Sequence, residues 1–225
     1  MEEKQRFIIT RDGSHTLYSE QFKATYHSVN GAMEESLYVF IKNGLHRYLS
    51  EHNTNNLNIL EMGFGSGLNT ILTYIETQKL NLEINYHTIE AFPINLNDVT
   101  QLNYSDKFSE TDLITFKKLH ECSWNHSHEL NAAFTLTKHN CTLQDFNINK
   151  QFDIIYFDAF SPTQQPELWT AEVFTKMHNL LKSGGVLVTY CAQGQMKRNL
   201  KASGFVIKAL PGFFGKREMT LAIKQ

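Results

Sequence analysis

The chain contains the run Leu57-Asn58-Ile59-Leu60-Glu61-Met62-Gly63-Phe64-Gly65-Ser66-Gly67-Leu68, which reads as a buried strand, a glycine turn and the start of a helix. Glycines stand at every second position of the turn, at Gly63, Gly65 and Gly67. Glycine lets the backbone adopt a positive φ and lets a ligand approach without meeting a Cβ atom. The run therefore predicts a nucleotide-shaped pocket at the end of this strand.

The spacing of the glycines bears on which ligand this pocket holds. A dinucleotide fingerprint has a third Gly or Ala three residues after the second glycine. Counted from Gly65 this position is Leu68, which disfavours NAD and a nicotinamide oxidoreductase. An acid followed by alternating glycines is instead the pattern of enzymes that use S-adenosylmethionine (SAM). The cofactor contacts expected from this run are Glu61, Gly63, Phe64, Gly65 and Gly67.

Size and composition restrict the class of protein. With 225 residues, 41% hydrophobic and 20% charged, we expect one globular domain plus an extension. No apolar run of about 18 residues is present to cross a bilayer, and the charged start Met1-Glu2-Glu3-Lys4-Gln5-Arg6 is unlike a signal peptide. Cys122, Cys141 and Cys191 fit neither a disulfide framework nor a CxxC metal site. We therefore expect a cytoplasmic protein with reduced thiols, without a metal or a membrane partner.

The net charge of −2 conceals a basic C-terminal part. Residues 176–225 carry nine Lys or Arg and one acid, Glu218, and so have a balance of +8, whereas residues 1–175 have a balance of −10. Nucleic-acid affinity comes largely from Lys and Arg that neutralise phosphates, so this asymmetry suggests a polyanionic partner. The alternative is a solvated helix face followed by a charged tail.

Strand and helix patterns alternate along the chain from residue 57. Before this point, short β segments flank Asp12-Gly13 within residues 6–28, and a helix is expected over 31–52. The later strands are expected at 57–62, 84–90, 134–138, 152–157, 185–191, 205–209 and 218–223, with helices at 67–78, from about 94, and at 166–182, the last ended by Gly184-Gly185. Residues 105–131 read as an irregular or helical insertion.

The last two expected strands are joined by a tight turn at Pro211-Gly212, so they must be antiparallel. The whole pattern predicts an α/β fold of the Rossmann-like methyltransferase type, with a mostly parallel sheet, a C-terminal antiparallel hairpin and a small β-rich N-terminal extension. We expect this extension to cover residues 1–56 and the SAM-dependent methyltransferase domain to cover residues 57–225.

Polar residues follow the second and third strands, where ligands bind in open α/β sheets. Glu90 can accept hydrogen bonds from both ribose hydroxyls of a nucleoside, although an acid at the start of a helix explains it too. Asn140 is placed to read an adenine edge, and Asp145 competes for that role. The cofactor contacts expected at these strand ends are Glu90, Ala91, Phe92, Asn140 and Cys141.

Asp158 follows the apolar strand at 152–157, where the strand end opens into the expected pocket. As a structural residue it would cap the following turn. As a functional group it would remove a proton from an attacking amine, because an alkyl ammonium has a pKa of about 10 and only the neutral amine has a free lone pair. Phe160 and Trp169 are close enough in sequence to offer a flat wall for a base.

Five blocks of the chain resemble the MnmD proteins, the stand-alone counterparts of the methyltransferase domain of MnmC. They keep the order of the family and lie between residues 26 and 219. The blocks are Tyr26-His27-Ser28-Val29-Asn30-Gly31-Ala32-Met33-Glu34-Glu35-Ser36-Leu37-Tyr38-Val39-Phe40, Glu61 to Asn69, Glu90-Ala91-Phe92-Pro93, Asp158-Ala159-Phe160-Ser161-Pro162 with Pro166-Glu167-Leu168-Trp169-Thr170, and Gly215-Lys216-Arg217-Glu218-Met219.

The resemblance implies SAM-dependent N-methylation of the aminomethyl group of 5-aminomethyl-2-thiouridine at the tRNA wobble position, which gives 5-methylaminomethyl-2-thiouridine. It implies that Asp158 is the active-site acid and that Gly63, Gly65 and Glu90 contact SAM. Asn140 departs from the family, which has an acid there. The expected substrate-binding residues are Tyr26, Phe160, Trp169, Lys216 and Arg217.

Two other functions stay open at this point. A polyamine-synthase-like transferase acting on a small amine would share the glycine strand and the acid after the fourth strand, but it would not need the basic end. A catalytically silent tRNA-binding module would not need Asp158. The sequence leaves open which tRNAs are modified, which enzyme supplies the aminomethyl group, and the oligomeric state.

Overall fold

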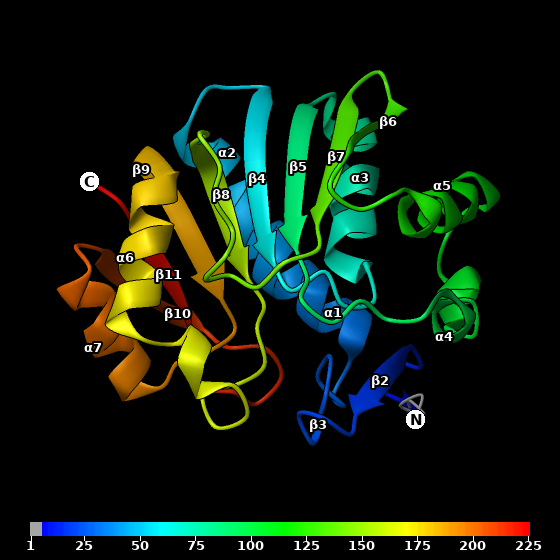
Figure 1. Cartoon of the computed structure of the whole chain (residues 1–225), viewed down its shortest axis with the longest axis horizontal. Helices are drawn as coiled ribbons and strands as arrows, with labels where there is room; N and C mark the ends of the chain where they lie inside the picture. Colours follow the sequence, from blue (N-terminus) through cyan, green and yellow to red (C-terminus); the bar gives the residue numbers. More distant parts are fainter. Residues whose placement is uncertain (1–5) are drawn as a thin grey trace.

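The computed structural model describes residues 6–225, and an eight-stranded sheet runs through it in the order β10-β11-β9-β8-β4-β5-β7-β6 (Figure 1). The charged start of the chain, residues 1–5, lies outside the described residues. The strands of this sheet are β4 (Asn56–Met62), β5 (Glu83–Ile89), β6 (Ser127–Asn131), β7 (Phe134–His139), β8 (Phe152–Phe157), β9 (Leu181–Thr189), β10 (Val206–Pro211) and β11 (Glu218–Ile223).

The middle of the sheet is parallel and both edges are antiparallel. β4 pairs in parallel with β5 on one side and with β8 on the other. β5 in turn pairs in parallel with β7, and β8 pairs in parallel with β9. β10 and β11 form the antiparallel hairpin predicted at the C-terminal edge. A second antiparallel strand, β6, pairs with β7 at the other edge and was not predicted, because it lies in the segment read as an insertion. The predicted Rossmann-like architecture is confirmed.

Helices cover both faces of the sheet. Their bounds are α3 (Leu68–Leu80), α4 (Leu96–Val99), η2 (Asn103–Asp106), α5 (Glu110–Glu121), η3 (Pro166–Leu168), α6 (Ala171–Leu180) and α7 (Gly194–Ala202). Figure 1 shows α6 and α7 together at the end of the sheet that carries β9 to β11, and α4 and α5 beside the opposite edge. None of the helices in residues 6–225 is both long and apolar enough to cross a membrane.

Two apolar cores result from the alternation of side chains along the buried strands. In β8, Ile154 and Tyr156 belong to the core shared with α3 and with the helical residues 32–51 of the N-terminal part. Ile155 and Phe157 belong to the core shared with α6 and α7. All four are fully buried, which explains the unbroken apolar run of this strand.

The N-terminal part contributes a small sheet and one long helical segment. β1 (Arg6–Ile9), β2 (His15–Ser19) and β3 (Ala24–Thr25) form an antiparallel sheet in that order. The helical segment consists of α1 (Ala32–Ser36), the π-helix η1 (Leu37–His46) and α2 (Arg47–Glu51). It packs on the main sheet through Gly44, where a Cβ atom would lie 3.0 Å from Val188 and 3.1 Å from Tyr156. The domain boundary at residue 56 stays a prediction.

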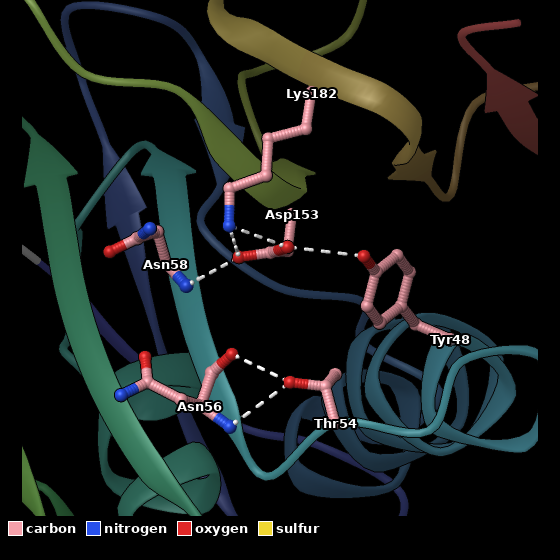
Figure 2. A network of polar contacts seen from close by, with 6 residues as sticks. All are labelled: Tyr48, Thr54, Asn56, Asn58, Asp153 and Lys182. Carbon is pink, nitrogen blue, oxygen red and sulfur yellow. Dashed lines mark hydrogen bonds and ion pairs between the residues drawn. The ribbon is translucent and has the colours of Figure 1, made fainter.

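At the amino ends of the central strands, Asp153 joins four elements (Figure 2). Its carboxylate accepts hydrogen bonds from the backbone N of Asn58 at 2.8 Å and from the Tyr48 hydroxyl at 3.1 Å, and it pairs with Lys182 at 2.8 Å. Asp153 is only 5% exposed. This network fixes α2, β4, β8 and β9 at the edge opposite the predicted ligand site.

The prediction for residues 166–191 needs a correction. The helix α6 ends at Leu180, and the strand β9 begins directly at Leu181. Gly184-Gly185 therefore lies inside the strand and does not end the helix. Gly184 has a φ of +79°, and the pairing of β8 with β9 shifts register between Phe152 and Ile154. The glycines form an irregularity of the strand, as glycine often does within sheets.

Candidate active site

The glycine turn adopts the backbone conformation that its sequence predicts. Gly63, Gly65 and Gly67 have φ values of +92°, +48° and +72°. A Cβ atom on Gly63 would lie 2.7 Å from the carbonyl oxygen of Asp158, and one on Gly65 would lie 3.1 Å from the Tyr26 ring. Glycine is thus required both by the backbone angles and by the close approach of the neighbouring strand end and of the N-terminal part.

A pocket lies over this turn at the carboxyl ends of β4, β5 and β8. Its lining includes six of the ten residues that the sequence predicts as cofactor contacts. The lining residues are Phe22, Tyr26, His27, Met62, Gly63, Phe64, Gly65, Glu90, Ala91, Phe92, Asp158, Ala159, Phe160 and Gln165. The predicted contacts outside this lining are Gly67, which is the N-cap residue of α3, and Glu61, Asn140 and Cys141.

Aromatic rings cover this pocket. Phe22 stacks on Phe160 with ring centres 4.4 Å apart, and it meets Phe92 edge-on at 5.7 Å. Tyr26 packs against Phe160 at 5.1 Å. The enclosed space measures only about 50 Å³, whereas small-molecule pockets typically measure roughly 300–1,000 Å³. In this conformation the pocket is therefore smaller than the pockets that usually hold nucleoside-sized ligands.

Glu90 ends β5 with its carboxylate beside the glycine turn. Oε2 accepts a hydrogen bond from the backbone N of Gly65 at 3.0 Å, and Oε1 accepts one from the backbone N of Phe92 at 2.9 Å. Burial raises the pKa of Glu90, and these backbone donors lower it. Each carboxylate oxygen has further lone pairs, so both can also accept from ribose hydroxyls. The glycine cradle and this carboxylate fit the nucleoside part of SAM.

Glu61 lies beneath the pocket and is fully buried. Oε2 accepts a hydrogen bond from the Thr70 hydroxyl at 3.0 Å, and burial raises the pKa of Glu61 to about 8. Gly67 faces α5, since a Cβ atom there would lie 2.8 Å from His120. Glu61 thus links β4 to α3, and Gly67 lies between the rest of the glycine turn and α3.

Asp158 follows β8 and is held from two sides. Its backbone N donates to the carbonyl of Met62 at 3.0 Å, and its Oδ2 accepts from the Asn69 side-chain nitrogen at 2.8 Å. Burial raises the pKa of Asp158 to about 7, although the Asn69 hydrogen bond and the Lys216 charge lower it. At neutral pH this carboxyl group can therefore both accept and release a proton.

A second cavity, of about 180 Å³, adjoins the cofactor pocket and also has Asp158 in its lining. Its walls bring together residues that are distant in sequence. The lining residues are Ala24, Thr25, Tyr26, His27, Ser28, Glu35, Asp158, Ala159, Phe160, Ser161, Gln164, Tyr190 and Lys216. Of the expected substrate residues, Tyr26, Phe160 and Lys216 meet here, and Arg217 lines an adjoining groove of about 570 Å³. Asp158 thus lies between the cofactor pocket and the second cavity.

Trp169 differs from its predicted placement. It is only 3% exposed, and its ring packs against Phe157 with centres 5.1 Å apart. Its Nε1 donates to the carbonyl oxygen of Phe160 at 2.8 Å. Because the ring is enclosed, it offers no open face to a base. Its nearness to Asp158 in the sequence did not reveal that the Trp169 ring points into the core. Through its hydrogen bond, Trp169 instead holds the backbone of Phe160 in place.

Asn140 and Cys141 lie beside the pocket, outside its lining. The Asn140 side-chain nitrogen donates to the carbonyl oxygen of Glu90 at 3.0 Å. Cys141 packs against the apolar core under α6. Asp145 accepts a hydrogen bond from the Thr142 hydroxyl at 2.6 Å, which is a local turn contact. An adenine contact by Asn140 stays a prediction.

Several residues of the two cavities were not singled out from the sequence. His27 contacts Ser66 of the glycine turn, with 2.9 Å between Nε2 and Oγ, and so ties the N-terminal part to the cofactor side. His27, Glu35 and Asn69 stand inside blocks that carry the family resemblance, which was a usable signal. Phe22 and Tyr190 had no such signal. The residues missed are Phe22, His27, Glu35, Asn69 and Tyr190.

Comparison with known proteins decides the family. The family described as S-adenosyl-L-methionine-dependent methyltransferase matches residues 102–225, which is more than half of the chain. The chain belongs to this family. SAM is therefore its cofactor, and the enzyme is a methyltransferase, as the glycine turn predicted.

Individual relatives agree with this assignment. The chain is 31% identical over 227 residues to the tRNA 5-methylaminomethyl-2-thiouridine biosynthesis bifunctional protein MnmC of Leptospira interrogans, covering 95% of the chain and 34% of that protein. It is 30% identical to the MnmC of Idiomarina loihiensis, covering 89% of the chain and 36% of that protein. The chain spans about a third of the length of the curated relatives it matches.

Among solved structures, MNMC2 from Aquifex aeolicus has a similar fold. It superposes with a TM-score of 0.79 at 24% identity, over 99% of this chain and 71% of that chain. The similarity extends over nearly the whole chain, so it includes the small N-terminal sheet as well as the methyltransferase sheet.

Proposed function

We propose that this methyltransferase acts on tRNA and methylates the aminomethyl nitrogen of 5-aminomethyl-2-thiouridine at the wobble position, giving 5-methylaminomethyl-2-thiouridine. The observation that carries the proposal is the position of Asp158, which lines both the cofactor pocket and the adjoining cavity. The MnmC relatives, named for the biosynthesis of this nucleoside, support the choice of substrate.

The residues present suit methylation of an amine. SAM, when bound, supplies an electrophilic methyl group. An alkyl ammonium must lose a proton before its nitrogen can attack, and Asp158, with its pKa raised by burial to about 7, can accept this proton. Asn69 holds the carboxylate in place by its hydrogen bond to Oδ2. Glu90 and the backbone of Gly63 and Gly65 would hold the nucleoside part of the cofactor.

The second cavity suits a planar base brought out of an RNA stack. Enzymes that modify bases read an extruded nucleotide by stacking it on aromatic side chains. Tyr26, Phe160 and Tyr190 supply such rings here. The groove lined by Arg217 adjoins this cavity through Lys216 and Tyr190, and it gives the RNA backbone a path to the site.

The C-terminal charge is less available than its total of +8 suggests. Among the described side chains, most of the Lys and Arg residues at positions 176–225 already have protein partners. Lys182 pairs with Asp153, Lys197 with Glu218 and Lys216 with Glu35. Lys176 and Lys224 donate to backbone carbonyls. We therefore expect Arg217 and the residues of α7 that face outward, such as Lys201, to supply the phosphate contacts.

Neither alternative is favoured. A polyamine-synthase-like enzyme is not supported by the MnmC relatives, and a silent binding module would not need a carboxylate at the junction of two cavities. The decisive experiment offers the protein and methyl-labelled SAM to three acceptors: tRNA with the aminomethyl group, the same tRNA without it, and a small polyamine. We expect label only in the first. Label in the polyamine alone would contradict the proposal.

A further inference from the structure

The second cavity contains an ammonium group of the protein itself. Nζ of Lys216 lies 2.5 Å from Oε1 of Glu35 and 4.9 Å from the centre of the Tyr190 ring. Both partners line the cavity that Asp158 also lines. A carboxylate and an aromatic face are the two kinds of group that bind organic ammonium ions most strongly in proteins.

Glu35 is largely buried and is held from two sides. It belongs to α1 and only 10% of its side chain is exposed. Its second oxygen, Oε2, accepts a hydrogen bond from the backbone N of Ser28 at 3.0 Å. Burying such a carboxylate without a cation is costly, so an ammonium group beside it stabilises its charged form.

Lys216, in contrast, is partly exposed at the rim of the cavity. Its side chain is 38% exposed, and it lies in the segment between β10 and β11, at the rim where the cavity meets the outer groove. The substrate proposed above ends in a primary alkyl ammonium, the same chemical group as the end of a lysine side chain. One cation can therefore replace the other without changing the charge of the site.

We propose that Glu35 and the face of Tyr190 form the binding site for the substrate ammonium, and that Lys216 occupies this site until the substrate displaces it. This inference rests on the proposed function. It separates two tasks: Glu35 binds the amine in its charged form, and Asp158, in the same cavity, removes the proton. An acceptor without a cation would have to expel Lys216 and leave Glu35 unpaired, so the site selects amines.

The test compares the affinity of the protein, saturated with S-adenosylhomocysteine, for two tRNAs that differ only in the aminomethyl group. The ratio of the two dissociation constants measures recognition of the ammonium. In the parent protein we expect a preference for the aminomethyl tRNA. Glu35→Gln should reduce this preference by about tenfold or more, because a charge-assisted hydrogen bond is lost. Its amide oxygen can still accept from Ser28.

The second variant, Lys216→Met, removes the competing ammonium while keeping an unbranched side chain that is only one atom shorter. It should increase the preference for the aminomethyl tRNA. If Lys216 contacts only phosphate, this variant would instead weaken the binding of both tRNAs by the same factor. The ratio of the dissociation constants would then be unchanged, and this result would overturn the inference. A ratio unchanged by Glu35→Gln would overturn it as well. Should Glu35→Gln fail to fold, the Lys216→Met ratio alone decides.

Matched controls are available next to each position. Glu34 is exposed on the same helix, so Glu34→Gln should leave the ratio at the parent value. Arg217→Met should weaken the binding of both tRNAs by the same factor. The proposed function is checked separately, with SAM and the parent protein: if the aminomethyl tRNA is not methylated, that function fails. If it is methylated and the ratios do not respond, only the assignment of Glu35 and Lys216 fails.

Discussion

The side chain of Asn69 donates a hydrogen bond to Oδ2 of Asp158 across 2.8 Å. Asn69 lies in the first turn of α3, directly after the glycine turn, while Asp158 follows β8. The segment that forms the cofactor cradle therefore also orients the carboxylate at the reaction site. The same hydrogen bond lowers the pKa of Asp158 against the effect of burial.

Activity should depend on the ionisation of Asp158. Because burial raises its pKa to about 7 and the mechanism needs the carboxylate, we expect kcat/KM to rise as the pH increases through about 7. Asn69→Ala removes a hydrogen bond that lowers this pKa, so the rise should move to higher pH. The pH profile of methyl transfer checks both. A parent profile that is flat between about pH 6 and 8 would contradict this assignment.

The same pKa predicts an effect on stability. Between about pH 4 and 7 the folded chain binds more protons at Asp158 than the unfolded chain, so this residue lowers stability as the pH rises through that window. Asp158→Asn removes this loss. Its gain in Tm over the parent protein should therefore be larger at about pH 8 than at about pH 4. Thermal unfolding at the two pH values provides the measurement.

Gly65→Ala should weaken SAM binding. The new Cβ atom would lie 3.1 Å from the Tyr26 ring, at a φ of +48° that alanine rarely adopts. Gly13→Ala is the matched control, because Gly13 also has a positive φ but has no atom within 4 Å of the added Cβ. Calorimetry with SAM should show reduced affinity for the first variant only. Equal affinity of both variants would mean that the turn does not hold the cofactor.

Arg217→Gln should weaken tRNA binding without changing SAM affinity. Each phosphate contact that is lost should reduce the slope of log affinity against log salt by about one unit. Binding measured at several salt concentrations checks this, with Lys197→Gln as a comparison, because Lys197 is already paired with Glu218. An unchanged slope for Arg217→Gln would show that the groove does not meet the RNA backbone.

Asp153→Ala should destabilise the fold while leaving the site intact. It leaves the backbone N of Asn58, the Tyr48 hydroxyl and the Lys182 ammonium without their acceptor (Figure 2). A loss of about 2 kcal/mol in the free energy of unfolding is expected. Glu172→Ala, an exposed acid on α6, should change it by less than about 0.5 kcal/mol. Urea denaturation distinguishes the two.

The sheet and the strand-end residues could be predicted because their signals are local. The apolar run of β8 ends at Asp158, and the glycine turn follows β4 directly, so each strand end can be read from a few neighbouring residues. The direction in which a side chain points cannot be read in this way. Trp169 stands eleven positions after Asp158 in the sequence, yet its ring faces the core under Phe160.

Contacts between distant parts of the chain left no signal in the sequence. Glu35 and Lys216 are 181 positions apart, and only the packing of α1 beside the segment before β11 brings them together. The edge strand β6 was missed because its alternation, Ser127-His128-Glu129-Leu130-Asn131, is too polar to resemble a strand. Its pairing comes from the neighbouring β7, which offers it backbone partners.

Mass spectrometry of the nucleosides from treated tRNA tests the central claim most directly. After incubation with SAM, the aminomethyl nucleoside at the wobble position should gain one methyl group on its side-chain nitrogen. Asp158→Asn should slow this by roughly 10²-fold or more, because an amide cannot accept the proton, while its SAM affinity stays near that of the parent. An unchanged aminomethyl nucleoside after incubation with the SAM-bound parent protein, or equal rates for the two proteins, would contradict the account.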